Sequence, residues 1–181
     1  MLSGGRTYFL YALVKNSSDK AAIDLTGKVA ILDSDGVLVD SSEAIGEGVL
    51  PRGRTIVWTE TDLDPGKRYR FRWKVSAASL QPGPKRSPVT FTNVEPFKSD
   101  MGCGYRGLVT TSFKKEYADG LALVVAGFSK GKLVYANTGG PNQLLPGTKA
   151  RFEASAFDFC PPPNIDRVEV FPDLSEAQLS D

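Results

Sequence analysis

The chain contains no histidine among its 181 residues. This absence excludes histidine-based acid–base catalysis, Ser-His-Asp and Cys-His nucleophile pairs, and histidine-ligated metals. The two cysteines form no Cys-x-x-Cys motif, so a thiolate metal site is not expected either. No Gly-Lys-Ser/Thr follows any glycine-rich segment, which excludes a P-loop. The sequence therefore predicts no catalytic residues, no cofactor and no metal.

Long apolar runs are also missing. The longest, residues 121–126, is far shorter than the roughly 20 residues that a membrane-spanning helix needs. The first five residues show no signal-peptide pattern, and whether the native chain carries a signal or lipid anchor stays open. The net charge of +1 gives no global field toward nucleic acid, so a nucleic-acid partner is not expected.

The cysteines, Cys103 and Cys160, both lie in the second half of the chain and bracket one predicted domain. Such a pair is typical of a disulfide formed in an oxidising compartment. In the chain-entropy model, a bridge closing a loop of this length contributes about 4 kcal/mol. The alternative is two unrelated buried thiols in a cytosolic protein.

Short sequence motifs of the first half of the chain recur in the second half about 95 residues later. After Leu50-Pro51 and Leu145-Pro146 one residue drops out, and Trp58 then aligns with Phe152. The other matches place Leu13-Val14 on Leu108-Val109, residues 29–32 on 124–127, Gly36 on Gly131, and Leu38-Val39 on Leu133-Val134. The repeat favours two domains of similar architecture.

Short runs of alternating apolar residues, separated by Gly, Pro, Asp and Asn, predict strands. Asp33-Ser34-Asp35-Gly36 predicts a tight hairpin turn, and residues 41–48 a connecting loop with room for one helical turn. Six or seven such strands per half predict an all-β protein made of two β-sandwiches. We expect domains at residues 1–78 and 89–181, joined by a Pro-rich linker at 79–88.

The order of these features resembles the FxLYD-type bacterial immunoglobulin-like domain. The shared features are a strand ending in Asn16-Ser17-Ser18, the Asp-x-Asp-Gly turn, a Leu-Pro-x-Gly turn and an aromatic-bearing strand. The naming motif falls on Ala30-Ile31-Leu32-Asp33, which lacks its Phe and Tyr. The resemblance implies two tandem immunoglobulin-like domains of a secreted or surface-anchored bacterial envelope protein, without catalytic residues.

Residues 67–75 are the best candidate for a binding surface. Because side chains alternate along a strand, Arg68, Arg70, Arg72 and Lys74 share one face, and Tyr69, Phe71, Trp73 and Val75 share the other. The aromatic face is expected in the core. The basic face fits an anionic partner. The plainer interpretation is a solvated face neutralised by Glu60 and Asp62 on a neighbouring strand.

The remaining polar residues indicate no catalytic site. Asp33-Ser34-Asp35-Gly36 begins like a calcium loop, but apolar residues follow where further ligands are required. The sequence therefore favours a non-catalytic binding or spacer module, extracellular or in the cell envelope. Its expected partners are an envelope protein, an anionic glycan or lipid head groups. The alternatives are an accessory domain of a glycan-acting enzyme, or a structural subunit of a phage or secretion assembly.

Overall fold

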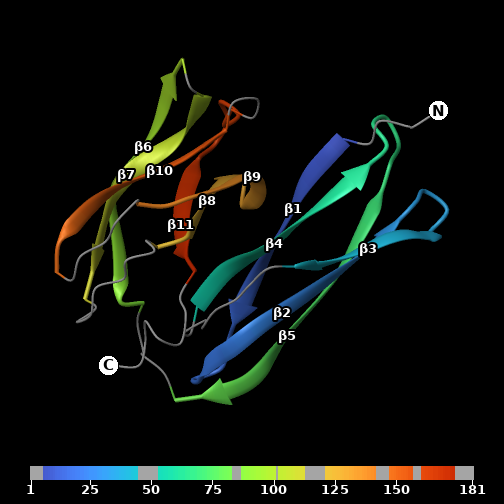
Figure 1. The fold of residues 1–181 in the computed structure, drawn as a ribbon, viewed down its shortest axis with the longest axis horizontal. Helices are drawn as coiled ribbons and strands as arrows, with labels where there is room; N and C mark the ends of the chain where they lie inside the picture. The colour runs from blue at the N-terminus through green and yellow to red at the C-terminus, as the bar shows by residue number, and fades with distance from the viewer. Residues whose placement is uncertain are drawn as a thin grey trace. The chain divides into compact units, whose positions relative to one another are not determined.

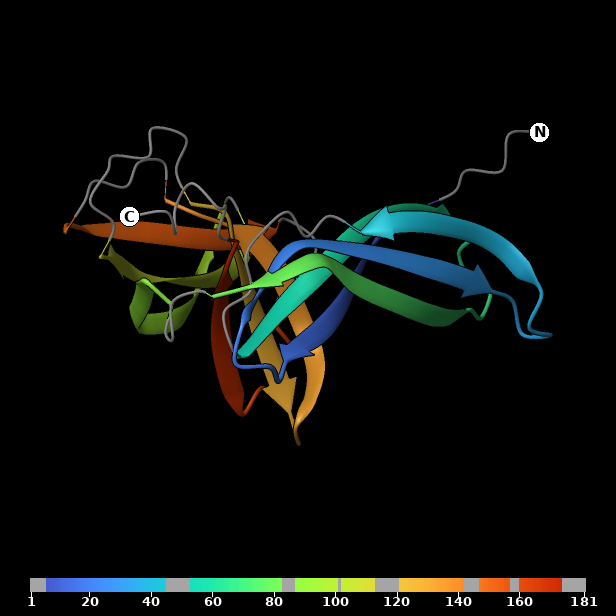
Figure 2. The ribbon, with the colours of Figure 1, turned by 90° about the horizontal axis from the view of Figure 1, so that it is seen from below.

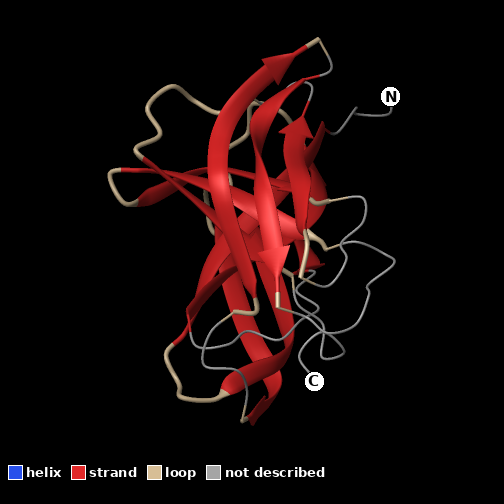
Figure 3. Ribbon diagram, turned by 90° about the vertical axis from the view of Figure 1, so that its left-hand side faces the viewer, coloured by secondary structure: helices blue, strands red, loops and turns tan. Residues whose placement is uncertain are grey.

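A computed structural model of the chain describes residues 6–44, 53–82, 87–100, 102–112, 121–141, 147–156 and 160–173. These residues form eleven β-strands and no helix (Figure 3). The prediction of an all-β protein is confirmed. The contacts divide the chain into two compact units, Met1–Gln81 and Pro82–Asp181, here called unit 1 and unit 2.

Unit 1 contains five strands, which pair in antiparallel fashion into two sheets (Figure 1). One sheet has the order β1-β4, and the other has the order β3-β2-β5. The strands are β1 (Arg6–Asn16), β2 (Ala21–Leu32), β3 (Leu38–Ala44), β4 (Gly53–Leu63) and β5 (Arg70–Gln81). In Figure 2 the strands β3, β2 and β5 run side by side, and the β2–β3 hairpin turns at one end of their sheet.

The two sheets of unit 1 enclose a core between them. Val29 and Ile31 of β2 are fully buried and pack with Leu63 of β4. Tyr69 and Trp73 pack against the same cluster, as expected for the aromatic face of residues 67–75. Phe71 faces the same side, since it pairs with Ile31, but remains 41% exposed.

Two expectations for unit 1 were wrong at element boundaries. Residues 41–44 belong to strand β3, where a loop or helical turn was predicted, because Ser41 and Glu43 pair with Ala30 and Lys28. Strand β5 continues to Gln81, so the first residues of the predicted linker are strand. Residues 83–86 of that linker, 45–48 of the predicted loop, 50–52 of the turn that follows it and the tail from 174 lie outside the described residues.

Unit 2 contains six strands in two three-stranded antiparallel sheets. The sheet orders are β10-β7-β6 and β11-β8-β9. The strands are β6 (Val89–Ser99), β7 (Gly102–Thr111), β8 (Leu123–Ser129), β9 (Lys132–Gly139), β10 (Lys149–Ala156) and β11 (Arg167–Pro172). Its core is formed by Val109, Val125 and Phe152, with the rings of Tyr105 and Tyr135 packed edge to face at 5.7 Å.

Cys103 and Cys160 form a disulfide, with 5.2 Å between their Cα atoms. Cys103 lies on β7, and Cys160 precedes the Pro161-Pro162-Pro163 segment, which contains no strand. The predicted bridge is confirmed, and both cysteines belong to unit 2.

The strand pairing corrects the alignment of the repeat. Ala12 pairs with Val57 in unit 1, and Gly107 pairs with Phe152 in unit 2. Both members are displaced by 95 residues (107 against 12, 152 against 57), so no residue drops out between them. Phe152 therefore corresponds to the buried Val57, whereas Trp58 points to the opposite face of β4 and contacts Phe9.

Candidate cationic face on unit 1

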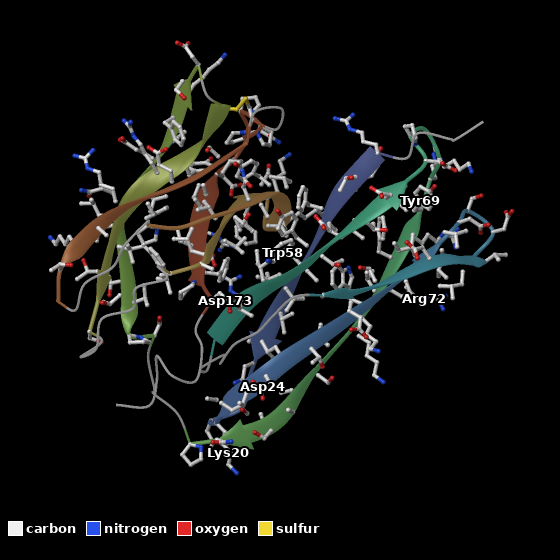
Figure 4. All side chains as sticks on the ribbon, in the orientation of Figure 1. Lys20, Asp24, Trp58, Tyr69, Arg72 and Asp173 are labelled. Carbon is white, nitrogen blue, oxygen red and sulfur yellow. A yellow bond between two sulfur atoms is a disulfide. The ribbon has the colours of Figure 1, made fainter. Side chains whose placement is uncertain are left out.

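Three of the four predicted basic residues line one face of the edge strand β5. Arg70, Arg72 and Lys74 are exposed and alternate with residues that face the core. Successive members stand roughly 7 Å apart, because a strand rises about 3.4 Å per residue. Arg72 is labelled in Figure 4 toward the end of the sheet where the β2–β3 hairpin turns, whereas Lys20 and Asp24 lie at the other end.

Arg68 does not belong to this strand, although the sequence pattern included it. Strand β5 begins at Arg70, and Arg68 lies in the connection that follows the Asp64-Pro65-Gly66 turn. The turn takes a positive φ of 85° at Gly66, which glycine tolerates without a steric penalty. Arg68 is exposed beside the row rather than part of its alternation.

A fourth cation on this face comes from β2, and sequence reasoning missed it. Lys28 pairs directly with Lys74, so the two side chains project from the same side of the sheet. Directly opposite residues have Cβ atoms roughly 5 Å apart. The alternation along β2 indicates that Lys28 faces away from the core, but only the pairing of β2 with β5 reveals its neighbour. Lys28, Arg70, Arg72 and Lys74 are together called the cationic face.

The carboxylate that partly neutralises this face is Glu43 of β3. Its Oε1 lies 2.8 Å from the Lys28 Nζ, and both side chains are largely exposed. The hydrogen bond and the charge of each partner raise the pKa of Lys28 and lower the pKa of Glu43. Since the pair is in water, it reduces the local charge without adding much stability.

The predicted neutralisation by Glu60 and Asp62 is wrong. Both residues lie on β4, which belongs to the other sheet of unit 1. Asp62 instead accepts a hydrogen bond of 2.6 Å from the Thr7 hydroxyl on β1. Within the described part of the chain, Arg70, Arg72 and Lys74 take part in no ion pair.

The Asp33–Gly36 segment is a hairpin turn, as predicted. The Asp33 carboxylate accepts hydrogen bonds from the backbone N–H groups of Asp35 and Val37, at 3.0 and 2.9 Å. Gly36 adopts a φ of 84°, and its N–H donates to the Asp33 carbonyl. The described residues contain no cluster of three or more potential metal ligands.

Three consecutive apolar residues follow this turn, and sequence reasoning placed them only as a returning strand. Val37, Leu38 and Val39 are 60%, 59% and 49% exposed, respectively. They are called the apolar tip. The register of β2 with β3 shifts between Ile31 and Leu32, so that Leu38 pairs with Leu32 and Val39 is left over as a bulge.

Unit 2 contributes a separate polar groove of about 490 Å³. A bulge in β6 forms one wall, where Asn93 takes a φ of 54° and the register shifts between Thr92 and Glu95. The lining residues are Asn93, Glu95, Arg106, Gly107, Leu108, Arg151, Phe152 and Glu153. Sequence reasoning did not predict this groove, because its residues come from β6, β7 and β10, which only strand pairing brings together.

Arg106 is held in place at the centre of this groove. Its Nε and Nη2 lie 2.9 and 2.8 Å from the Glu95 carboxylate, and its guanidinium lies 5.9 Å from the centre of the Phe97 ring. Glu153 pairs with Arg106 from the other neighbouring strand. The groove thus offers a guanidinium paired with Glu95, and Glu153 opposite it in the register, for hydrogen bonding with a polar ligand.

No protein-family model, curated protein or solved structure matches the chain. Within the described residues, no helix is long and apolar enough to cross a membrane.

Proposed function

We propose that this protein is a non-catalytic binding module of the cell envelope or extracellular space, and that unit 1 binds an anionic partner through the cationic face. The observation that carries the proposal is the imbalance of charge on one sheet face. Four cations share it, and one carboxylate, Glu43, is paired with only one of them. The attractions of Arg70, Arg72 and Lys74 for a polyanion add together along the row.

Two further observations support the location and class. A disulfide is typical of oxidising compartments outside the cytosol. The resemblance of the turn and strand order to FxLYD-type immunoglobulin-like domains agrees with an envelope protein of bacteria. Anionic polymers and lipid head groups are both present in that setting, so the partner class is an anionic glycan, an envelope protein or a lipid head group.

The proposal is tested by binding to a soluble polyanion, for which we choose polyphosphate, at several salt concentrations. Each cation near an anionic surface contributes about 1 kcal/mol. The variant R70Q/R72Q/K74Q should therefore bind about 100-fold more weakly and with a shallower salt dependence.

The matched control is K98Q/K132Q/K149Q, which removes three exposed lysines from unit 2 and has the same net charge. It should bind polyphosphate like the wild type. Equal loss in both variants would show that only net charge matters, and would contradict a specific cationic face.

The groove of unit 2 favours a second candidate, an accessory role in binding a neutral glycan. Its charged lining residues, Glu95, Glu153, Arg106 and Arg151, balance in charge, and with Asn93 they offer donors and acceptors to sugar hydroxyls. Titration with neutral oligosaccharides, followed by the amide NMR signals of unit 2, tests this role. If Glu153→Gln abolishes the glycan-induced changes in these amide signals but retains polyphosphate binding, the result supports a glycan site separate from the cationic face.

A structural subunit of a larger assembly is the remaining alternative. Such a protein would form rings or fibres, which measurement of the mass in solution across a concentration series would detect. A monomer at all concentrations contradicts that alternative.

A further inference from the structure

Among the described residues of unit 1, the apolar tip is the largest group of exposed apolar side chains that are adjacent in the sequence. Val37, Leu38 and Val39 each expose about half or more of their surface. A run of exposed apolar residues is costly for solubility and marks an interaction site when it is maintained. Contact with the apolar region of a partner would remove these side chains from water and would therefore be favourable.

The tip is a preformed structure and not a loose loop. The Asp33 N–H donates to the Val37 carbonyl at 3.0 Å, and the Asp33 side chain receives two backbone N–H groups of the turn. The bulge at Val39 turns an additional side chain outward next to Leu38. Because these hydrogen bonds hold the turn in place, little conformational entropy is lost when the tip meets a partner.

The tip and the cationic face occupy the same end of one sheet. Leu38 pairs with Leu32, and Leu32 pairs with Arg70, so these three residues form one row across β3, β2 and β5. Arg72 stands one strand step of roughly 7 Å further from the tip, and the Lys74–Lys28 row stands a second step away. Measured along the strand direction, all four cations thus lie within roughly 15 Å of the row that contains Leu38.

We propose that the anionic partner is the surface of an anionic lipid bilayer, into which the apolar tip inserts while the cationic face contacts the head groups. This inference rests on the proposed function of the cationic face. A soluble polyanion would satisfy the cations but would leave the apolar tip in water. A bilayer offers both, because its phosphates form a layer roughly 5–8 Å deep directly above the acyl chains, and its negative potential extends outward by a Debye length of roughly 8–10 Å, which together cover the span of the cationic face.

Carboxylates near the tip weaken the attraction of this end of the sheet for an anionic bilayer. The Asp33 carboxylate is occupied by backbone N–H groups, and Asp64 is bonded to Lys67. Asp40 accepts a hydrogen bond from Thr61 at 3.0 Å. Asp35 is exposed within the turn itself, and it is the charge that opposes an anionic surface most directly.

Vesicle co-sedimentation of the full chain tests the inference. The vesicles contain phosphatidylcholine with or without one quarter phosphatidylglycerol, and polyphosphate binding is measured in parallel. The variant V37S/L38S should bind anionic vesicles at least about tenfold more weakly, because it loses two inserted apolar side chains. It should bind polyphosphate like the wild type.

Three further variants separate the possible outcomes. The control L80S/V134S changes two other exposed apolar residues, 52% and 37% exposed, and should leave vesicle binding unchanged. Asp35→Asn should strengthen binding to anionic vesicles about fivefold. R70Q/R72Q/K74Q should lose both vesicle and polyphosphate binding.

Failure of this inference differs from failure of the proposed function. If V37S/L38S binds anionic vesicles as well as the wild type does, or if neutral vesicles bind equally well, the bilayer inference is overturned. If R70Q/R72Q/K74Q retains polyphosphate binding, the proposed function of the cationic face is overturned instead.

Discussion

The two units share one pattern of strand pairing and differ in what their outer faces carry. In unit 1 the sheets are β1-β4 and β3-β2-β5, and the corresponding strands of unit 2 pair as β7-β10 and β9-β8-β11. The bulge is also shared, since the register shifts at Ile31/Leu32 in one unit and at Gly127/Phe128 in the other. Unit 2 adds β6 beside β7.

The edge strands β5 and β11 illustrate the difference outside the core. The pairings place Trp73 opposite Val29, and Val170 opposite Val125, so these strands correspond residue by residue. By that correspondence, Arg70 and Arg72 match Arg167 and Glu169. In unit 2 the Arg167 Nε lies 3.0 Å from the Glu169 carboxylate, so the strand neutralises itself. By the same correspondence, Lys74 and Lys28 match Phe171 and Val124, so Arg70 is the one member of the cationic face with a cationic counterpart, Arg167, in unit 2.

The cores differ by a compensating change of size. Ala12 faces Val57 in unit 1, and Gly107 faces Phe152 in unit 2. A Cβ at Gly107 would lie 2.8 Å from the Phe152 ring. The larger ring thus occupies space that the smaller partner leaves free. Inward positions conserve total volume, because cores are close-packed, whereas outward positions are free to vary.

The largest expected effect tests which residues correspond in the core. Phe152→Ala should lower the stability of unit 2 by about 3–5 kcal/mol, because the ring is buried and leaves a cavity. Trp58→Ala removes a side chain from the outer face and should lower the stability of unit 1 by about 1–2 kcal/mol. Denaturant unfolding followed by circular dichroism measures both. Equal losses would favour the alignment of Trp58 with Phe152 over the one given by strand pairing.

Removal of the disulfide should affect one unit alone. Cys103→Ser with Cys160→Ser should lower the stability of unit 2 by about 2–4 kcal/mol, because it releases a long loop in the unfolded state. Both tryptophans, Trp58 and Trp73, lie in unit 1. Their fluorescence transition should stay unchanged, while the unfolding transition of unit 2, followed by its amide NMR signals, shifts to lower denaturant. A matching shift of both signals would show that the units unfold together.

Substitutions between glycine and alanine at the matched positions 107 and 12 test the difference in size between the two cores. Gly107→Ala should destabilise unit 2 by about 1–3 kcal/mol, since the added methyl group meets the Phe152 ring and the Thr92 carbonyl. Ala12→Gly, the matched change in unit 1, should cost about 0.5–1 kcal/mol through backbone entropy. Thermal unfolding measures both losses. A neutral Gly107→Ala would mean that the core of unit 2 has spare room.

The smallest effect concerns alkaline pH. Burial raises the pKa of Tyr105 and of Tyr135. The folded state therefore binds their protons more tightly than the unfolded state, and stability is lost as pH rises above the ordinary tyrosine pKa of about 10. Replacing both residues by Phe should flatten this dependence in a melting series from pH 8 to 11. An unchanged slope would assign the alkaline loss to other groups.

Features that depend on a few neighbouring residues follow from the sequence alone. The turn at Asp33–Gly36, the alternation of residues 70–75 and the all-β composition follow from backbone chemistry over a few residues. The prediction failed where partners lie far apart in the chain. Glu60 and Asp62 were assigned to the wrong sheet, and Lys28 and the groove around Arg106 gave no signal.

The sequence by itself determined which side chains share a strand face, because alternation has a period of two and needs no partner. It also determined the two cysteines available for a bridge. Only the tertiary structure decided which strands pair and in what register, and bulges such as the one at Val39 shift that register by a residue. That choice places Lys28 beside Lys74 and the apolar tip beside Arg70, and so creates the surface proposed to bind an anionic bilayer.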